Sequence, residues 1–351
     1  MPASFLLYGA NGYVGEAAAR LAVAQGLRPI LAGRDAAKIA PLATELGLEA
    51  RAFGLDDAGG ADRALRDVPL VLHLAGPYKY TAKAMVDACL RGGAHYLDIT
   101  GEIPVFEALA ARDEEARSRK IMLLPAVGFD VVPTDCLALH LKQRLPSATR
   151  LTLAFQSVGR SGLPPGTQRT MIELIPFGDR VRREGRLVVP ERGEALRSVD
   201  FGQGPVQAVR LTWGDVFTAY YSTGIPNIEV YVVMPEAARK QRALLQKMRL
   251  LLGLAPLRKL LQRGVRPGPT AEARAGTVTH VWGEVEDASG RKAAARLHGP
   301  EAGLVWTTRA ALAVVRKVLG GTFSPGFQTP AKVYGADLVL ECEGVTREDV
   351  P

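Results

Sequence analysis

The stretch FLLYGANGYVG, residues 5–15, constrains the fold of this chain more than any other. Four apolar residues run into Gly9, glycines recur at Gly12 and Gly15, and an alanine-rich amphipathic segment follows at once. This pattern predicts a buried parallel strand, a tight turn, and a helix whose N-terminus points at the turn. Gly9 would permit the turn, Gly12 would let the backbone approach a pyrophosphate, and Gly15 would let the helix pack closely on the strand.

The free N–H groups at the start of such a helix attract phosphates. Glycine turns are common, and an ordinary strand-to-helix turn is the alternative. The context favours dinucleotide binding, because the turn follows a strand, opens a helix and is followed at the right distance by a second strand, residues 29–32. The cofactor contacts expected from this turn are Gly9, Asn11, Gly12, Tyr13, Val14 and Gly15.

The residues after the second strand indicate which dinucleotide is bound. A site that prefers NAD usually places an acid at this strand end to hold the ribose 2′-OH. This chain has Arg34 in that position and Asp35 one residue later. A guanidinium offers a planar fork that matches a phosphate, so NADP(H) is favoured. The alternative is a solvated Arg34 beside an Asp35 that caps the next helix, and both roles are compatible.

Composition sets the outer bounds. The 351 residues suit two domains, and 47% hydrophobic with 23% charged residues describe an ordinary globular protein. The formal net charge of +8 favours anionic partners, for which a phosphorylated cofactor is the economical explanation. Three well-separated cysteines argue against a zinc site and a disulfide framework, and suit a reducing cytoplasm. The N-terminus enters a strand at once, which argues against a signal peptide, and no apolar run is long enough to span a bilayer.

Strand and helix patterns alternate through the first part of the chain, which predicts a doubly wound parallel sheet of the Rossmann type, with an α/β fold overall. The further strands expected here are residues 49–53, 70–74, 95–99 and 121–124, and the helices are 16–25, 36–46, 60–66, 79–91, 103–117 and 133–141. The continuous apolar strand 70–74 indicates burial on both faces of the sheet.

Cofactor contacts are expected where these strands end, because ligands of open α/β sheets bind at the carboxyl edge. Asp56 would lie beside the adenine, or would cap the helix that follows. Thr100, with Glu102, would serve either helix capping or the active site. The residues expected along this edge are Asp56, Ala75, Gly76, Pro77, Tyr78, Thr100, Gly128 and Asp130.

Five motifs occur in a fixed order and at matching intervals: GANGYVG at 9–15, AGR at 32–34, GPY at 76–78, YLDITGE at 96–102 and GFDVVPTD at 128–135. As a set they resemble saccharopine dehydrogenase-like oxidoreductases, a family that includes fungal saccharopine reductases and trans-acting enoyl reductases of bacterial lipid and polyketide pathways. Farther on, STGIPN at 222–227 and the glycine-rich loop 162–167 look like the enoyl-reductase branch. The resemblance implies a Rossmann domain, then a mixed α/β domain with a largely antiparallel sheet, and a C-terminal segment that returns to the first domain.

The second part of the chain is compatible with an α+β domain and an antiparallel meander. Its expected strands are residues 150–156, 187–189, 206–212, 216–222, 228–234, 277–286, 292–297 and 337–341, and its helices are 167–175, 236–263 and 304–319. The domain limits expected are 1–135 for NADP binding, 136–302 for substrate binding and dimerisation, and 303–351 for the returning segment. The start of helix 167–175 would hold a substrate anion, or the loop before it is only a flexible connection.

Residues 236–263 form the most basic helical stretch, interrupted near Gly253 and Pro256. Such a stretch can lie on a membrane surface or an acidic partner. It is more typical of a helix that covers a sheet with its charged face in water. Nucleic-acid binding is disfavoured, because the chain has no recognition motif and no aromatic stacking platform. A homodimer is left open.

The chemistry of hydride transfer needs a proton source near the reacting bond. Tyr78 is the best proton donor, with an aromatic wall as its alternative role, and Asp130 would position a substrate amine or a water, or would cap the next helix. No metal site is expected. The sequence thus predicts an NADP(H)-dependent oxidoreductase that reduces a C=C bond, or a C=N bond, of a small-molecule substrate. A non-catalytic NADP-binding scaffold or sensor is the alternative.

Overall fold

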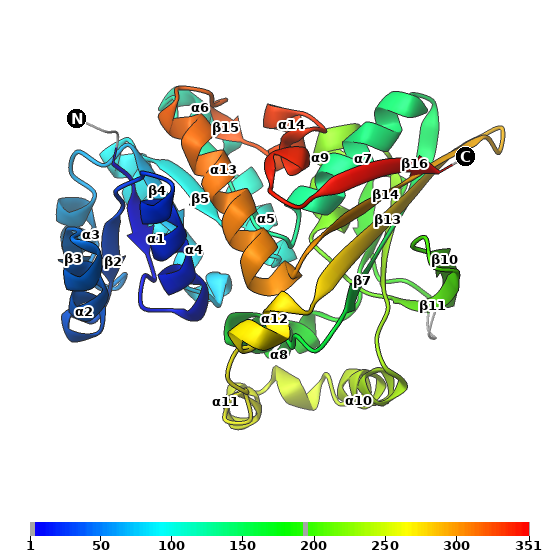
Figure 1. Ribbon diagram of the computed structural model, residues 1–351, viewed down its shortest axis with the longest axis horizontal. Helices are drawn as coiled ribbons and strands as arrows, with labels where there is room; N and C mark the ends of the chain where they lie inside the picture. Colours follow the sequence, from blue (N-terminus) through cyan, green and yellow to red (C-terminus); the bar gives the residue numbers. More distant parts are fainter. Residues whose placement is uncertain (1–3, 192–195, 351) are drawn as a thin grey trace.

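The computed structural model describes residues 4–191 and 196–350 (Figure 1). A seven-stranded sheet, parallel throughout, has the strand order β15-β6-β5-β4-β1-β2-β3. Its strands are β1 (Leu6–Tyr8), β2 (Ile30–Gly33), β3 (Ala50–Ala52), β4 (Leu70–His73), β5 (His95–Asp98), β6 (Met122–Leu124) and β15 (Gly326–Phe327). The doubly wound parallel sheet that the sequence predicts is confirmed.

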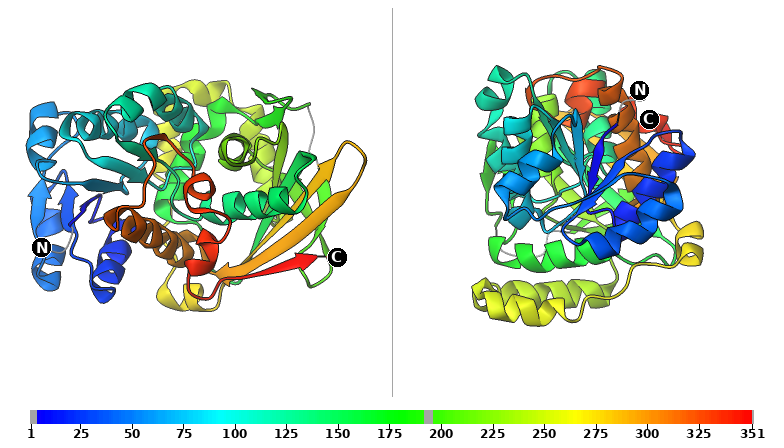
Figure 2. Two further views of the ribbon diagram at one scale, coloured as in Figure 1. Left: turned by 90° about the horizontal axis from the view of Figure 1, so that it is seen from above. Right: turned by 90° about the vertical axis from the view of Figure 1, so that its left-hand side faces the viewer.

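Helices cover both faces of this sheet, which is why its central strands are mainly apolar and are buried along their whole length. Figure 2 shows the strands enclosed between helical layers. The covering helices are α1 (Tyr13–Ala24), α2 (Ala36–Leu46), α3 (Ala58–Ala64), α4 (Tyr78–Gly92), α5 (Ile103–Ala110), α6 (Asp113–Ser118) and α13 (Thr307–Leu319). Helix α1 presents its small side chains, Ala18, Ala19 and Ala22, to the core, and α13 contacts both α1 and β4.

A second sheet of nine strands is mostly antiparallel, with β7 and β12 as its parallel pair. The strands are β7 (Ala148–Val158), β8 (Val181–Arg183), β9 (Arg186–Val188), β10 (Leu196–Asp200), β11 (Pro205–Arg210), β12 (Asn227–Val232), β13 (Val278–Asp287), β14 (Lys292–Pro300) and β16 (Thr346–Val350). The α/β fold with a mostly antiparallel second sheet is therefore confirmed.

Helix α7 (Val132–Arg144) packs on the second sheet: a Cβ added to Gly283 of β13 would lie only 2.7 Å from the Leu141 side chain. The other short or peripheral elements are α8 (Pro165–Leu174), η1 (Ile175–Phe177), α9 (Asp215–Thr223), α10 (Glu236–Lys247), η2 (Leu251–Gly253), α11 (Ala255–Gln262), α12 (Ala271–Ala275), η3 (Ala302–Trp306), α14 (Pro330–Tyr334) and η4 (Leu338–Glu341). None of the helices within the described ranges has both the length and the apolar content needed to cross a bilayer.

The C-terminal segment contributes to both sheets. Strand β15 pairs with β6 of the first sheet, and β16 pairs with β14 of the second. One buried hydrophobic cluster runs through side chains of both sheets, including Leu72 of β4 and Leu153 of β7. The domain limits 1–135, 136–302 and 303–351 stay predictions, because a continuous core joins the parts they would separate.

Three expectations about local structure are wrong. Residues 216–222 were expected to be a strand but lie in helix α9, where Val216, Phe217 and Ala219 are buried while Tyr220 and Tyr221 are exposed. Buried residues run without interruption from Asp215 to Ala219, so this stretch lacks the in-and-out alternation of a half-buried strand.

The final strand is also misplaced, because residues 337–341 contain the 3-10 helix η4 and the last strand is β16. The single helix expected over 103–117 is broken into α5 and α6 at Ala111 and Arg112.

Candidate cofactor site

The turn between β1 and α1 is built so tightly that two of its glycines have no room for a side chain. Gly9 has φ 92°, and a Cβ on it would lie 2.9 Å from the carbonyl carbon of Leu74. A Cβ on Gly15 would lie 2.1 Å from the Gly9 oxygen, whereas one on Gly12 would approach the same oxygen only to 3.1 Å. Gly9 and Gly15 are thus required by the fold, while Gly12 has space in front of it.

Helix α1 begins after this turn without a side-chain cap. Gly12 is its N-cap residue and offers no hydrogen-bonding side chain, so the N–H groups of the first turn face outward. Asn11 is exposed, and Tyr13 and Val14 are half-buried. The Tyr13 hydroxyl donates to the Pro269 carbonyl oxygen at 3.0 Å. A glycine cradle in front of an uncapped helix N-terminus fits the pyrophosphate of a dinucleotide.

Arg34 follows β2 at the edge of this cradle. Its side chain is exposed and forms no ion pair or hydrogen bond within residues 4–191 and 196–350. The neighbouring carboxylate has another role, since Asp35 accepts from the Ala37 N–H at 3.1 Å and caps α2. The predicted division of roles therefore fits the structure: Asp35 is occupied and Arg34 is open to an anion.

Asp56 lies on the same side as Arg34. Burial raises the pKa of the Tyr8 phenol, the Arg34 charge lowers it and the Asp56 charge raises it, so both charged groups act on one aromatic ring. The helix cap proposed as an alternative for Asp56 belongs instead to Asp57, which accepts from the Gly60 N–H at 2.9 Å. Asp56 is left exposed beside the open end of β3.

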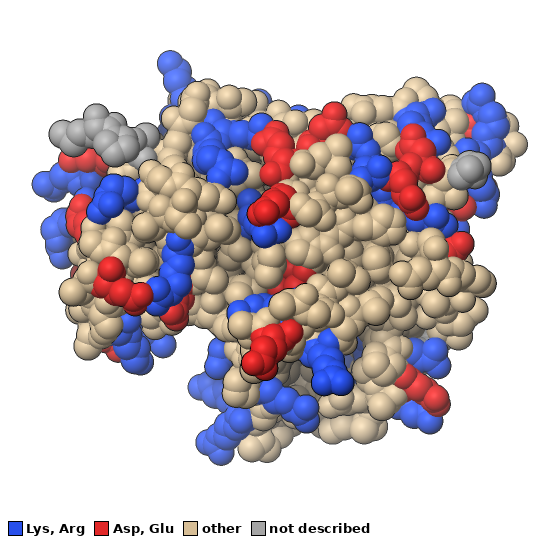
Figure 3. Space-filling model, in the orientation of Figure 1, with Lys and Arg blue, Asp and Glu red and all other residues tan. Residues whose placement is uncertain are grey.

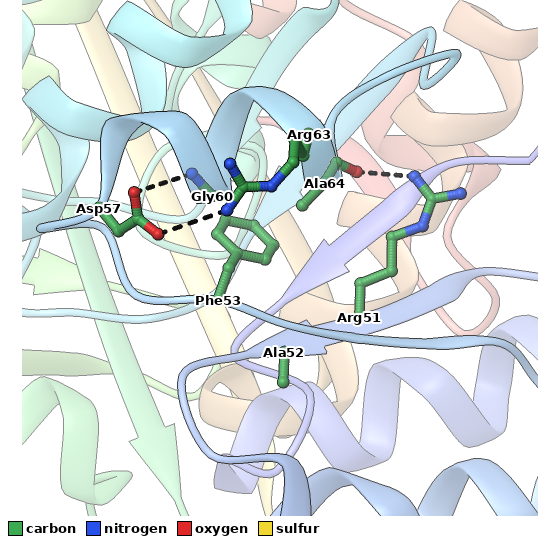
Figure 4. Close-up of a pocket in the computed structure, with 7 residues that line it drawn as sticks. All are labelled: Arg51, Ala52, Phe53, Asp57, Gly60, Arg63 and Ala64. Carbon is green, nitrogen blue, oxygen red and sulfur yellow. Dashed lines mark hydrogen bonds and ion pairs between the residues drawn. The ribbon is translucent and has the colours of Figure 1, made fainter.

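A pocket of about 340 Å³ lies between β3 and α3 (Figure 4). Its polar side chains already have partners: Asp57 binds the Gly60 N–H and lies 3.7 Å from Arg63, and Arg51 donates to the Ala64 carbonyl oxygen at 2.6 Å. None of the predicted cofactor contacts lines this pocket, so we do not include it in the cofactor site.

The segment after β4 holds Tyr78 inward. The tyrosine is buried, its hydroxyl donates to the His73 carbonyl oxygen at 3.2 Å, and its ring packs edge-on against the His73 ring. Burial and the nearby Asp98 and Glu102 raise the pKa of the Tyr78 phenol well above its ordinary value. A phenol with a raised pKa is a poor proton donor. The structure therefore favours the alternative role of Tyr78, an aromatic wall, over that of a proton donor. Ala75, Gly76 and Pro77 precede it at the surface, and the Ala75 carbonyl accepts from Thr81 at 2.8 Å.

Glu102 is a buried carboxylate that caps a helix other than its own. It accepts from the Tyr78 N–H at 2.8 Å, from the Lys79 N–H at 2.9 Å and from the Thr170 hydroxyl at 3.2 Å. It therefore satisfies the first turn of α4 and ties it to α8. Thr100 accepts from the Glu102 N–H at 3.1 Å, but α5 itself has no side-chain cap, so the expected cap of that helix by Thr100 and Glu102 is not formed. An active-site role for Thr100 stays a prediction.

Asp98 organises the same edge, and the sequence did not single it out. It accepts from the Tyr96 hydroxyl at 2.7 Å and from the Thr100 and Ala126 N–H groups, each at 2.9 Å. Burial raises its pKa to about 6. An acid as the last residue of β5, at the carboxyl edge of the sheet, is the signal that could have identified it.

Asp130 is a carboxyl group at this edge for which the structure describes no partner. It forms no hydrogen bond or ion pair with any residue that the structure describes, and it does not cap α7, whose N-cap is Val131. Burial, and next the negative charge of Glu102, raise the pKa of Asp130 to about 7. Gly128 lies just before it, where a Cβ would come within 3.0 Å of the Thr307 methyl group.

The fold and the cradle together define a Rossmann-type dinucleotide-binding protein with a second, mostly antiparallel sheet. Residues 5–124 match the family model described as the saccharopine dehydrogenase NADP binding domain. The resemblance to saccharopine dehydrogenase-like oxidoreductases that the motifs predict is thus confirmed, and the site is one for a nicotinamide cofactor.

Curated relatives agree with this assignment. The chain is 30% identical over 208 residues to Rv2449c of Mycobacterium tuberculosis, named as a candidate trans-acting enoyl reductase; the match covers 54% of this chain and 49% of the relative. It is 25% identical over 205 residues to the saccharopine dehydrogenase-like oxidoreductase of Rattus norvegicus, with 51% and 47% covered. The chain therefore spans about half the length of the curated relatives it matches.

A solved structure extends the likeness in fold to the whole chain. The saccharopine dehydrogenase (L-Glu forming) of Saccharomyces cerevisiae, solved without ligand, superposes with a TM-score of 0.67 over 99% of this chain and 100% of that one. The two sequences are 13% identical, so this match supports the fold of both sheets alone.

Proposed function

We propose that this protein is an NADP(H)-dependent oxidoreductase that transfers a hydride to an unsaturated bond of a metabolite. The observation that carries the proposal is Arg34, exposed near the uncapped start of α1 and without an ion pair or hydrogen bond among the residues that the structure describes. Gly9, Gly12 and Gly15 would hold the pyrophosphate against the helix, and Arg34 would hold a 2′-phosphate with its planar fork. When bound, the nicotinamide ring supplies the hydride.

Reduction of C=C is preferred to reduction of C=N. The support comes from relatives: besides the Mycobacterium tuberculosis protein, a Mycobacterium leprae protein named trans-acting enoyl reductase is 30% identical over 148 residues, which cover 40% of this chain and 35% of that protein. Saccharopine dehydrogenase, the structural match, keeps imine chemistry as the second candidate.

Measurement of NADPH oxidation distinguishes an enzyme from a non-catalytic scaffold. Purified protein should oxidise NADPH, followed at the absorbance of the reduced nicotinamide, when an α,β-unsaturated acyl thioester is added, and more slowly with a cyclic imine. Faster oxidation with the imine would favour the C=N assignment. Tight NADPH binding without oxidation by either class of acceptor would favour the alternative, a non-catalytic NADP-binding scaffold or sensor.

Asp130 is our candidate for the proton donor that completes the reduction. With its pKa raised to about 7, a large share of this carboxyl group is protonated near neutral pH, unlike an ordinary aspartate. The acid is present below about pH 7 and is lost as pH rises through that value. We therefore expect kcat/KM to fall about tenfold per pH unit above about pH 7.

Asp130→Asn tests this assignment. The variant cannot donate a carboxyl proton, so kcat should fall about 100-fold and the alkaline limb of the pH profile should disappear. Asp67→Asn, a change of the same kind at an exposed position, should leave the profile as it is. An alkaline limb that persists in Asp130→Asn would assign the proton to another group.

A further inference from the structure

The helical arm, residues 236–263, carries almost all of the net charge of the chain. It comprises α10, η2 and α11 and contains eight Lys and Arg residues and one acidic residue, a net charge of +7 where the whole chain has +8. In Figures 1 and 2 the arm lies as a separate layer at the lower edge of the molecule, and Figure 3 shows Lys and Arg gathered over that edge. A charge this concentrated favours an anionic partner.

The arm is attached to the protein largely by polar side chains, with Leu252 of η2 as a buried leucine. Neither α10 nor α11 contains a buried residue. Arg242 of α10 forms an ion pair with Asp179 at 2.5 Å, and Arg258 of α11 forms one with the buried Glu173 of α8 at 3.0 Å. Gln262, one turn beyond Arg258, also donates to Glu173. The faces that these helices turn toward the protein are therefore largely polar.

The apolar side chains of the arm point outward instead. Leu250 is 84% exposed, and Leu254 and Leu260 are each 59% exposed, while Leu252 is the apolar side chain that the arm buries. The remaining exposed members of this apolar face are Leu244, Met248, Leu251, Leu257 and Leu261. A helix that covers a sheet with its charged face in water would show the opposite arrangement. This face has the composition of one that inserts into an apolar phase.

Basic groups flank this apolar face without partners of their own. Lys247, Arg249, Lys259 and Arg263 form no ion pair within the described ranges of the chain. Leucines on one side of a helix with Lys and Arg around them are the composition of helices that lie in the interface of an anionic bilayer. A second copy of the chain is a poorer occupant, because a two-fold contact through this face would oppose two +7 surfaces.

We propose that the helical arm docks on an anionic membrane surface, with its exposed leucines, among them Leu250, Leu254 and Leu260, in the headgroup boundary and the basic side chains on the lipid phosphates. The binding is peripheral and uses the apolar and the charged component together. Docking in this way places the side of the protein that carries the arm next to the bilayer.

Vesicle sedimentation tests the docking. The full-length protein should bind vesicles of phosphatidylcholine mixed with phosphatidylglycerol, and should bind vesicles of phosphatidylcholine alone about tenfold or more weakly. Raised salt should weaken the first interaction. Absence of binding to the anionic vesicles would overturn the proposal.

Two pairs of matched variants separate the apolar from the charged contribution. Leu250→Glu with Leu254→Glu should lower anionic-vesicle binding about 100-fold, whereas Leu196→Glu with Leu340→Glu, the same change at exposed leucines outside the arm, should not. All four side chains are exposed, so thermal unfolding should be little changed in either variant.

The variant that tests the charged contribution is Lys259→Gln with Arg263→Gln, which should weaken anionic-vesicle binding about tenfold. Its control is Arg66→Gln with Lys332→Gln, the same change at exposed positions outside the arm. Equal losses in test and control variants would refute a specific docking face. If light scattering shows a dimer that the leucine variant converts to a monomer, while no vesicle binding is seen, the face is a contact between two copies and the proposal fails.

Discussion

Arg34→Ala should weaken NADPH binding about 10- to 100-fold and leave NADH binding nearly unchanged. The reason is local: Arg34 is exposed at the end of β2, and Asp35, the carboxylate next to it in the chain, is occupied in capping α2. Charge-assisted hydrogen bonds from one guanidinium to a phosphate contribute about 1.5–3 kcal/mol, which sets the size of the loss. Because Arg34 makes no contact that the fold depends on, the variant should unfold at the same temperature as the parent.

Isothermal titration with both cofactors measures this effect, since NADH differs from NADPH only in lacking the 2′-phosphate. Arg34→Lys keeps the charge but loses the fork, so its NADPH affinity should fall between those of the parent and Arg34→Ala. Arg66→Ala removes the same charge at another exposed position of the same domain and should change neither affinity. Equal losses of NADPH and NADH in Arg34→Ala would contradict the 2′-phosphate role.

Sequence reasoning succeeded where the determinants are local. The turn after β1 is specified by glycines, because neighbouring backbone atoms occupy the space that a side chain would need. Strands β1 and β4 are mainly apolar and fully buried because helices cover both faces of the sheet. Such features depend on residues that are close together in the sequence. The cap of α2 by Asp35 is of the same kind, since its acceptor lies two residues before the donor.

The failures come from contacts between residues far apart in the chain. The stretch 216–222 has the aromatic and β-branched residues of a strand, yet it is helical in α9. Phe217 stacks on Phe106 of α5, with ring centroids 5.8 Å apart, and meets Phe327 of β15 edge-on at 6.1 Å. Contacts between residues this far apart in the chain do not change the local spacing of apolar residues. Tertiary packing therefore overrides the local preference for a strand.

The candidate site shows the same limit. Glu102 can be read as the first-turn acid of its own helix, but its carboxylate caps α4, whose N–H groups lie more than twenty residues earlier. Backbone N–H groups carry no sequence signature, so this pairing could not be predicted. Asp56 and Asp57 are adjacent and chemically equal, and only the structure assigns the cap of α3 to Asp57.

Gly15→Ala and Gly12→Ala should separate the two roles of the glycine turn. A Cβ at position 15 would lie 2.1 Å from the Gly9 oxygen, which is an overlap. Because that oxygen belongs to the backbone and cannot rotate away as a side chain can, α1 must move away from β1. Replacing a helical glycine gains only about 0.5–1 kcal/mol of helix propensity, while overpacking costs about 1–3 kcal/mol or more, so the clash decides the sign. Gly15→Ala should therefore lower the unfolding temperature and lose cofactor binding together.

Gly12→Ala should behave differently, because its Cβ would approach the Gly9 oxygen only to 3.1 Å and meets no other atom of the turn within 4 Å. The unfolding temperature should change little, yet NADPH and NADH should both bind about tenfold or more weakly, since the methyl group occupies the approach to the pyrophosphate. Gly92→Ala, at the end of α4 with contacts no closer than 3.7 Å, is the matched control and should alter neither property. Differential scanning fluorimetry without ligand, together with titration of both cofactors, measures the contrast; a Gly12→Ala variant that binds both cofactors as the parent does would show that phosphates do not approach the backbone at this glycine.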